Sequence, residues 1–265
     1  MGGQRVFDDL GFRWDRSLVP IDVPVHSVER AAFRLHKSLP EYVWDAAVLE
    51  GNPFTFPDVQ TLLDGVTVGG HRLGDERQVL NLVASARELL RLVKEERFTL
   101  DKATSDALHA IIAQDEAFDA GHFRGEGEEK RLTPGVSLGP HGRYLPESTE
   151  PGGENLRRIH SRGLAAITEG LDTTYEQALI YFLFGALQQF YFDGNKRTSR
   201  YLMNGHLMSH GIDAISVPAA RAHDFNTFMV EFFRFREGTR MVAFLSDCHP
   251  DAAEITTPAV RALLH

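Results

Sequence analysis

The sequence contains a single cysteine, Cys248, among its 265 residues. A lone cysteine excludes the internal disulfide framework on which small secreted proteins depend. A chain without disulfides suits a reducing cytosol, and we expect Cys248 to be a small buried apolar side chain. The protein must therefore fold around a hydrophobic core alone.

Long apolar runs are absent as well. No stretch approaches the ~18 residues of a membrane-spanning helix. The first residues, MGGQRVFDDLGFRW, carry charges where a secretory signal needs an apolar segment. Val6 stands where a myristoylation site prefers Ser or Thr. We expect a cytoplasmic protein with no membrane partner.

Positive charge is in deficit. The chain has 28 Lys and Arg against 37 Asp and Glu, which gives a net charge of −9 at pH 7. A general nucleic-acid-binding protein usually presents a basic face, so we expect no nucleic-acid partner. The hydrophobic fraction of 43% and the charged fraction of 25% are ordinary for a globular protein. The length predicts one large domain, or one domain with an additional N-terminal lobe.

Most of the chain has a helical pattern. Apolar residues recur at helical spacing, Ser27 is a predicted N-cap, and Gly51 and Gly211 are predicted to follow helix ends. Residues 1–25 show no clear period, and we expect them to be loosely ordered. Predicted helices cover 27–39, 41–52, 55–65, 74–96, 99–116, 154–170, 173–190, 195–211, 223–235 and 238–248.

One region differs in composition. Residues 119–153 are rich in Gly, Pro and charge, and within them GVSLGPHGRYLP (135–146) predicts two short strands around a Gly-Pro-His-Gly turn. Long irregular stretches in compact domains are often functional. The predicted fold class is therefore all-α, a helical bundle with one short β-hairpin.

The segment YFDGNKRTSR, residues 191–200, predicts an anion site between two helices. The first turn of a helix leaves N–H groups unpaired, and the helix dipole adds partial positive charge there. Gly194 permits close approach of the backbone, and Asp193 is an oxygen ligand suited to a phosphate-bound Mg²⁺. Further candidate phosphate contacts are Asn195, Lys196, Arg197 and Arg200.

Two simpler interpretations stay open at this point. Asp193-Gly194 is a frequent hairpin-turn pair, and clustered Lys and Arg side chains often form a solvated face. The helical pattern of the flanking segments disfavours the hairpin. The sequence has neither a P-loop nor a G-x-G-x-x-G motif, which excludes those two kinds of nucleotide-binding loop.

The segment resembles the motif of the Fic family, H-x-F-x-[D/E]-G-N-[G/K]-R-x-x-R, which corresponds here to residues 189–200 with Gln189 at the histidine position. AAVLEGN (46–52) resembles the inhibitory helix of that family, and GVSLGPHGRYLP resembles its flap hairpin. The resemblance extends over about residues 28–248. It implies a Fic-like helical bundle of the class with an N-terminal inhibitory helix.

The resemblance also implies a function and roles for the site. Fic proteins typically transfer AMP from ATP, with Mg²⁺, to a hydroxyl of a target protein. Asp193 would hold Mg²⁺, Glu50 would compete with ATP for Arg200, and the flap, residues 133–146, would align the target protein by strand addition. The implied phosphate contacts are Gly194, Asn195, Lys196, Arg197 and Arg200.

Three departures from the family pattern bring that activity into question. Gln189 replaces the histidine that accepts the proton of the target hydroxyl, and loss of a general base typically costs ~10²–10⁴ in rate. His141, in the flap turn, is a candidate substitute. Lys196 stands where most AMP-transferring members have Gly, whereas the Doc toxins, which transfer the γ-phosphoryl group, also have Lys. Ala46 replaces a Ser or Thr of the inhibitory helix.

Four functional hypotheses therefore stay open. The first is a Fic-type protein adenylyltransferase with weakened or altered activity, autoinhibited through Glu50. The others are a non-catalytic nucleotide-binding regulator, a Doc-like phosphotransferase, and an interaction module that uses the flap. The sequence does not identify the target protein. It also leaves the oligomeric state open, and a homodimer is one option.

Some remaining residues allow both a structural and a functional interpretation. His206 and His210, four apart on a predicted helix, suit packing or surface positions, and a metal site there would need a third ligand. His223-Asp224 predicts a helix start rather than a catalytic pair. FMVEFFRF (228–235) predicts core, or part of an adenine pocket.

The sequence predicts four parts of the chain. An entry segment is expected at 1–27, an N-terminal helical part with the inhibitory helix at 28–115, a Fic core with flap and motif at 116–250, and a tail at 251–265.

Overall fold

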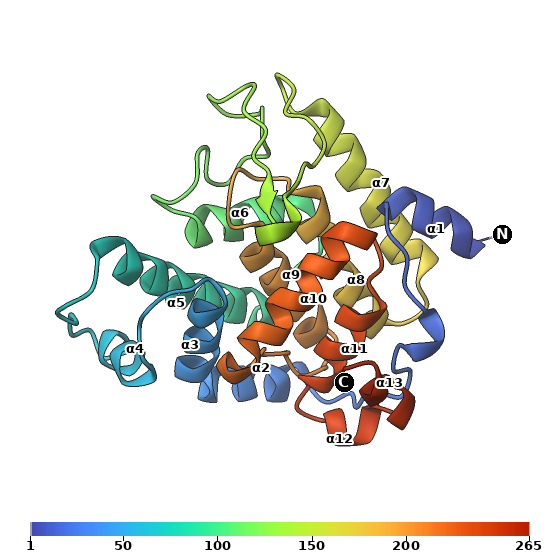
Figure 1. Ribbon diagram of the computed structural model, residues 1–265. Helices are drawn as coiled ribbons and strands as arrows, with labels where there is room; N and C mark the ends of the chain where they lie inside the picture. Colours follow the sequence, from blue (N-terminus) through green and yellow to red (C-terminus); the bar gives the residue numbers. More distant parts are fainter. Residues whose placement is uncertain (1, 265) are drawn as a thin grey trace.

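The computed structural model describes residues 2–264, with side chains from residue 5 onward. In this part of the chain the fold is almost entirely α-helical with one two-stranded hairpin, as predicted (Figure 1). The helices are α1 (Gly2–Leu10), α2 (Val28–Lys37), α3 (Leu39–Leu49), α4 (Phe56–Leu63), α5 (Leu73–Lys94), α6 (Lys102–Ile112), α7 (Glu154–Gly170), α8 (Thr174–Gln188), α9 (Asn195–Ser209), α10 (Ala222–Phe235), α11 (Thr239–Asp247), α12 (Ala252–Ile255) and α13 (Pro258–Ala262).

Helices α8 and α9 form the centre of the molecule (Figure 1). Nearly every α8 residue from Tyr175 to Leu187 is buried, which confirms the predicted central helix. The two helices pack closely at Gly185, where a Cβ atom would lie 2.2 Å from Oγ of Ser199. Helices α5 and α6 pack against α9, and α7 and α11 pack against α8. Among the described residues, no helix has both the length and the apolar character to cross a membrane.

The entry segment is more ordered than the sequence predicted. Residues 1–25 were expected to be loosely ordered, but α1 packs against α7 and buries Val6 and Leu10, which are four residues apart on one helical face. Beyond α1, Trp14 is buried and its indole N–H donates to the Glu176 carboxylate at 2.9 Å. The expectation was wrong because α1 is a short helix. Its apolar residues are too few to show a clear helical period in the sequence.

The hairpin consists of β1 (Val136–Ser137) and β2 (Arg143–Tyr144), which pair antiparallel around a 3₁₀ turn, η2 (Gly139–His141). Its inner side faces α10, because the Tyr144 ring lies 5.1 Å from the ring of Phe233. The predicted hairpin is therefore present, and it lies beside the loop that joins α8 to α9 (Figure 1).

Helix α3 carries Glu50 towards the same loop. It packs against α5, and Glu50 is its C-cap residue. Gly51 follows with φ +76°, a left-handed conformation that favours glycine and that turns the chain away from the helix. Ser27 caps α2 by accepting the Arg30 N–H, as predicted. The four-part division of the chain stays a prediction.

Candidate anion-binding site

The loop between α8 and α9 is held by the side chain of its own Asn195. The Asn195 Oδ1 accepts the Tyr191 N–H at 2.9 Å, and its Nδ2 donates to the Tyr191 carbonyl at 2.8 Å and to Gln189 Oε1 at 3.2 Å. Gln189 and Gly194 adopt left-handed backbone conformations, with φ of 51° and 71°. The loop is therefore a fixed turn between helices, and the hairpin alternative for Asp193-Gly194 is wrong.

His109, on α6, holds the loop from the other side. Its ring stacks on the Tyr191 ring at 3.7 Å. Because Nδ1 accepts the Gly121 N–H at 2.9 Å, Nε2 carries the proton and donates to the Asp193 carbonyl at 2.9 Å. Burial lowers the pKa of His109 to about 4, so the ring is neutral at pH 7. The neutral ring thus fixes the backbone of Asp193.

Helix α9 begins without a side-chain cap. Its first turns carry Lys196, Arg197 and Arg200, which we call the motif cations. The Arg197 side chain is 3% exposed and pairs with Glu116 at 2.8 Å. The Arg200 side chain is 6% exposed, and its Nη1 has no hydrogen-bond partner among the described residues. The two arginines are buried side chains, which excludes the solvated-face alternative for them, whereas Lys196 is 28% exposed.

Glu50 lies in front of these cations. Its carboxylate is 3.5 Å from Arg200 Nη2 and 4.0 Å from Lys196 Nζ. Burial alone would raise the pKa of the Glu50 carboxyl, but the motif cations outweigh burial and lower it, Lys196 most strongly. Glu50 is therefore ionised at neutral pH and lies beside Arg200 and Lys196.

A cavity of about 260 Å³ opens at the start of α9. Glu50, Gln189 and Lys196 line it, whereas Arg197 and Arg200 do not. Its other lining residues are Pro134, Gly135, Val136, Phe192, Asp193, Gly194, Asn195 and Phe233. Glu50 thus contacts both the cavity and Arg200.

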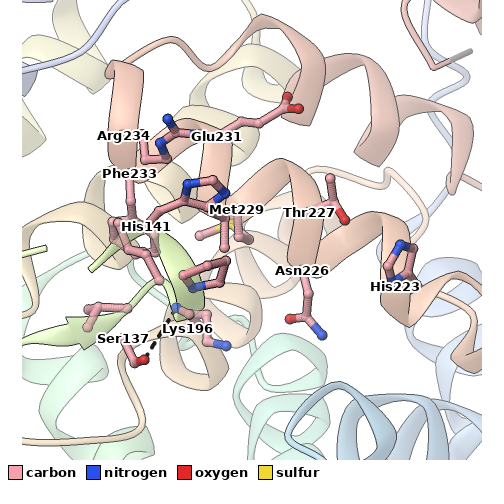
Figure 2. Close-up of a pocket in the computed structure, with 15 residues that line it drawn as sticks. Ser137, His141, Lys196, His223, Asn226, Thr227, Met229, Glu231, Phe233 and Arg234 are labelled. Atoms are coloured by element: carbon pink, nitrogen blue, oxygen red, sulfur yellow. Dashed lines mark hydrogen bonds between the residues drawn. The ribbon is translucent and has the colours of Figure 1, made fainter. Parts of the chain in front are cut away.

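A larger cavity of about 610 Å³ adjoins the first, and both are lined by Val136, Lys196 and Phe233. Figure 2 shows that its wall is built from the hairpin and from one face of α10, with Met229 and Phe233 among the lining side chains. Together the two cavities offer a charged end at α9 and a mainly apolar end under the hairpin. In the Phe-rich segment, Phe228, Phe232 and Phe233 are buried as predicted and Phe233 lines both cavities, whereas Phe235 is 62% exposed.

Gln189 and Asp193 face the small cavity in different ways. Gln189 is buried and uses both polar ends internally, because its Nε2 donates to the Ala186 carbonyl at 2.7 Å while its Oε1 accepts from Asn195. The Asp193 side chain is 66% exposed. Its Oδ1 accepts the Gly194 N–H at 2.6 Å, and its Oδ2 has no hydrogen bond to any described residue. A carboxylate oxygen is thus available at the mouth of the cavity.

Two residues that support the site were missed in the sequence. Arg124 is completely buried and joins the loop to the segment after the hairpin: its Nε donates to the Gln189 carbonyl at 2.6 Å, and its Nη2 donates to the Glu147 carbonyl at 2.8 Å. Burial lowers the pKa of Arg124 to about 10. Glu116, which pairs with Arg197, also accepts from Gln78 at 3.1 Å. Neither residue belongs to a motif, so only contacts in three dimensions identify them.

The histidines considered in the sequence lie elsewhere. His141 lines the large cavity and not the one that contains Gln189, and Figure 2 shows it beside α10. His223 lies in the first turn of α10, as predicted, and also lines the large cavity. His206 pairs with Gln177 at 3.0 Å, and His210 donates to the His206 carbonyl at 2.8 Å. These last two positions are explained by packing.

Solved structures with a similar fold are Fic proteins. A Fic family protein from Desulfovibrio desulfuricans G20 has a TM-score of 0.63 at 16% identity, covering 83% of this chain and 66% of that chain. Fic-1 (aa134–508) from C. elegans has a TM-score of 0.64 at 17% identity, covering 99% and 71%. A Fic domain containing signaling protein from Bacteroides thetaiotaomicron has a TM-score of 0.63 at 16% identity, covering 99% and 94%.

The chain therefore has the Fic domain fold, as the motif and the hairpin implied. No protein-family model matches the sequence, and no curated protein matches it. The present chain spans about two thirds of the length of the Desulfovibrio protein. At these identities the likeness establishes the fold alone.

Proposed function

We propose that this protein binds Mg-ATP at the start of α9 and resembles the protein adenylyltransferases, with transfer of AMP slowed because Gln189 replaces a base. One observation carries the proposal. The uncapped N-terminus of α9 and Lys196 line a cavity whose size and charge suit a phosphate chain, and Arg200 lies behind Glu50, which also lines it. The buried, unpartnered Nη1 of Arg200 is a hydrogen-bond donor that an anion would satisfy.

The proposed binding mode divides the nucleotide between the two cavities. Phosphates would lie in the cavity at α9, against Gly194, Asn195 and Lys196. The exposed carboxylate of Asp193 would hold the Mg²⁺ that accompanies them, since Mg²⁺ prefers oxygen ligands. The nucleoside would lie in the larger cavity, where Met229 and Phe233 supply apolar surface. A target protein with a hydroxyl side chain would align along the hairpin.

Gln189 explains why transfer would be slow. A glutamine amide has no useful basicity, and its two polar ends already bond to Ala186 and Asn195. It therefore cannot take the proton of an attacking hydroxyl, which predicts a loss of ~10²–10⁴ in rate relative to a site with a base. His141 lines a different cavity, so we do not assign it the role of base.

Glu50 would regulate the same site. Glu50 lines the small cavity and its carboxylate contacts Arg200, so an ATP phosphate and Glu50 would compete for one guanidinium. Ala46, one turn earlier on α3, is 6% exposed and has no hydroxyl to add to this contact. Arg197 would act indirectly, because its guanidinium is already paired with Glu116.

Two alternatives rest on specific residues. A non-catalytic nucleotide-binding regulator is supported by the internally bonded Gln189. A phosphotransferase of the Doc type is supported by Lys196, which lines both cavities. A pure interaction module has weaker support, because it gives no role to the buried Arg197 and Arg200.

The test separates binding from transfer. Mg-ATP binding is measured by calorimetry, and transfer is followed with ATP labelled at the α- or the γ-phosphate, on the protein itself and on a lysate. The variants are Gln189→His, Glu50→Gly and their combination. Gln188→His is the matched control, since Gln188 bonds to the Leu10 carbonyl at 3.1 Å and lines neither of the two cavities.

We expect binding in all of these proteins and α-label transfer that rises ~10²–10⁴-fold with Gln189→His but not with Gln188→His. Transfer by the wild type at the rate of Gln189→His would mean that the base is supplied in another way. Transfer of γ-label alone would favour the phosphotransferase. Failure of Glu50→Gly to bind Mg-ATP would overturn the proposal.

A further inference from the structure

A second charged cluster lies beyond the other end of α9. Three segments meet there: the chain before α2 contributes His26, the chain after α9 contributes Asp213, and the chain after α11 contributes Asp251. One nitrogen or oxygen of each residue lies within 4.8 Å of the others. Among the described residues this is the group of His, Cys, Asp and Glu side chains whose geometry suits a metal ion.

The cluster contains polar atoms that are buried and have no hydrogen-bond partner among the described residues. They are His26 Nε2, Asp213 Oδ1 and Asp251 Oδ2, one from each member. The Asp213 side chain is 1% exposed, so its unpartnered oxygen is fully removed from water. Buried polar atoms without partners are rare and costly, and three residues of one cluster that each have such an atom indicate a missing ligand.

The residues around the cluster do not supply that ligand. Arg34, on α2, bonds to Asp213, but through Oδ2, which leaves Oδ1 free. His249 accepts the Asp251 N–H through Nδ1 at 3.1 Å, which fixes the turn that carries Asp251. The cluster therefore holds two carboxylates and one guanidinium, which pairs with Asp213, and a divalent cation beside neutral histidines would balance the remaining charge.

The backbone brings the segments together independently of any ligand. The His26 N–H donates to the Gly211 carbonyl at 2.7 Å. A Cβ atom on Gly211 would lie 2.0 Å from the His26 carbonyl oxygen, and Gly211 has φ +75°, so only glycine allows this approach. The position of His26 against the end of α9 is thus built into the fold.

We propose that His26, Asp213 and Asp251 bind a divalent transition-metal ion of the Zn²⁺ class. One imidazole nitrogen and two carboxylate oxygens are ligands that Zn²⁺ accepts, with water completing the coordination, whereas Mg²⁺ and Ca²⁺ sites rely on oxygen alone. The ion joins the N-terminal segment, the end of α9 and the C-terminal segment. It can enter through a cavity of about 410 Å³ that Arg34, Asp213 and Pro250 line.

The experiment measures Zn²⁺ binding to the full chain. Wild type is compared with His26→Gln and Asp251→Asn, which keep side-chain size and remove one ligand each. The control is His210→Gln. This variant removes a histidine that lies outside the cluster, against His206 on α9. Affinity is obtained by chelator competition, and the unfolding temperature is followed with Zn²⁺, with Mg²⁺ and with chelator. Equal unfolding temperatures in chelator show that the variants fold.

We expect one Zn²⁺ per chain and an unfolding temperature that rises with Zn²⁺ but not with Mg²⁺. Each ligand variant should bind Zn²⁺ at least ~100-fold more weakly, since loss of a group that only supports a ligand already costs 10–100-fold. The His210→Gln protein should match wild type. Equal Zn²⁺ affinity in wild type and both ligand variants, or loss of binding in His210→Gln, would overturn the proposal and leave Asp213 as the partner of Arg34 alone.

Discussion

The two ends of α9 collect opposite charges. The motif cations lie at its N-terminal end, where Lys196 lines a cavity, whereas Asp213 and Asp251 lie close together beyond its C-terminal end. Neither arrangement follows the helix dipole, which favours negative charge at the N-terminus and positive charge at the C-terminus. Each end would therefore be stabilised by a ligand whose charge is opposite to that of its side chains: an anion at one end and a metal cation at the other.

The ends differ in how they are held. The N-terminal end is fixed by hydrogen bonds from Asn195, His109 and Arg124, none of which requires a ligand. The C-terminal end is fixed by the backbone contact between His26 and Gly211, by the Arg34–Asp213 ion pair and by Asn204, which bonds to both backbone groups of Ile215. The first end is preassembled, whereas at the second end Asp213 Oδ1 and Asp251 Oδ2 lack partners that a ligand would supply. This difference can be tested by removing each support.

The largest effect is expected from Arg124, the distant support of the N-terminal end. Arg124→Met leaves the Gln189 and Glu147 carbonyls and the Thr149 hydroxyl without a buried donor. The free energy of unfolding, measured by urea denaturation, should fall by about 3–5 kcal/mol. Arg143→Met is the control, because Arg143 is exposed and makes a single long bond of 3.3 Å to Gly135. A loss below ~1 kcal/mol in Arg124→Met would contradict preassembly.

Acid should weaken the N-terminal end through His109. Burial holds the pKa of His109 at about 4 in the folded protein, against 6.5 for an ordinary histidine. The unfolded chain therefore takes up the proton first, and the free energy of unfolding should fall as pH decreases from 6.5 to 4, by up to about 3 kcal/mol from this group.

A matched pair of variants isolates this contribution. His109→Phe preserves stacking on Tyr191 and removes the titrating group, so stability should depend less on pH between 6.5 and 4, whatever its value at pH 7. His36→Gln, at an exposed position of α2, should retain the wild-type slope. Identical slopes in His109→Phe and wild type would show that His109 titrates normally.

Substitution of Glu50 tests whether its carboxylate competes with an added anion at the N-terminal end of α9. Glu50→Gln removes the charge that faces Lys196 and Arg200, so Mg-ATP should bind between about 5- and 150-fold more tightly. Calorimetry measures the affinity. The control is Glu41→Gln, an exposed glutamate in the first turn of the same helix, which should bind like wild type. Unchanged affinity in Glu50→Gln would remove Glu50 from the regulatory role.

The sequence predicted the N-terminal end better than the C-terminal end. Gly194, Asn195 and Lys196 are neighbours in the chain, so a short motif contains most of the geometry. The metal cluster draws His26, Asp213 and Asp251 from positions up to 225 residues apart, and no local pattern links them. Residues that support a site from a distance in the chain, such as Arg124, are equally hard to identify from the sequence, because they belong to no motif or periodic pattern.

The fold was predicted for a similar reason. Helices such as α5 and α8 are long or strongly apolar, and the hairpin is bounded by turn residues. A local sequence pattern therefore predicts each of these elements. No such pattern predicts α1, because nine residues hold too few apolar positions to show a period. Helix α1 packs against α7, and the spacing of residues in the sequence does not reveal this contact.

The smallest effect should come from Tyr191, which replaces the Phe of the family motif. Its hydroxyl pairs with Ser105 and Asp106, each at 2.8 Å, while its ring stacks on His109. Tyr191→Phe should lower the free energy of unfolding by about 1 kcal/mol, because one buried hydrogen-bonding group is lost while the stack remains. Mg-ATP affinity should stay within about twofold, since Asn195 binds the backbone of residue 191 rather than its side chain. A large loss of affinity would mean that the hydroxyl, and not the loop backbone, organises this end of α9.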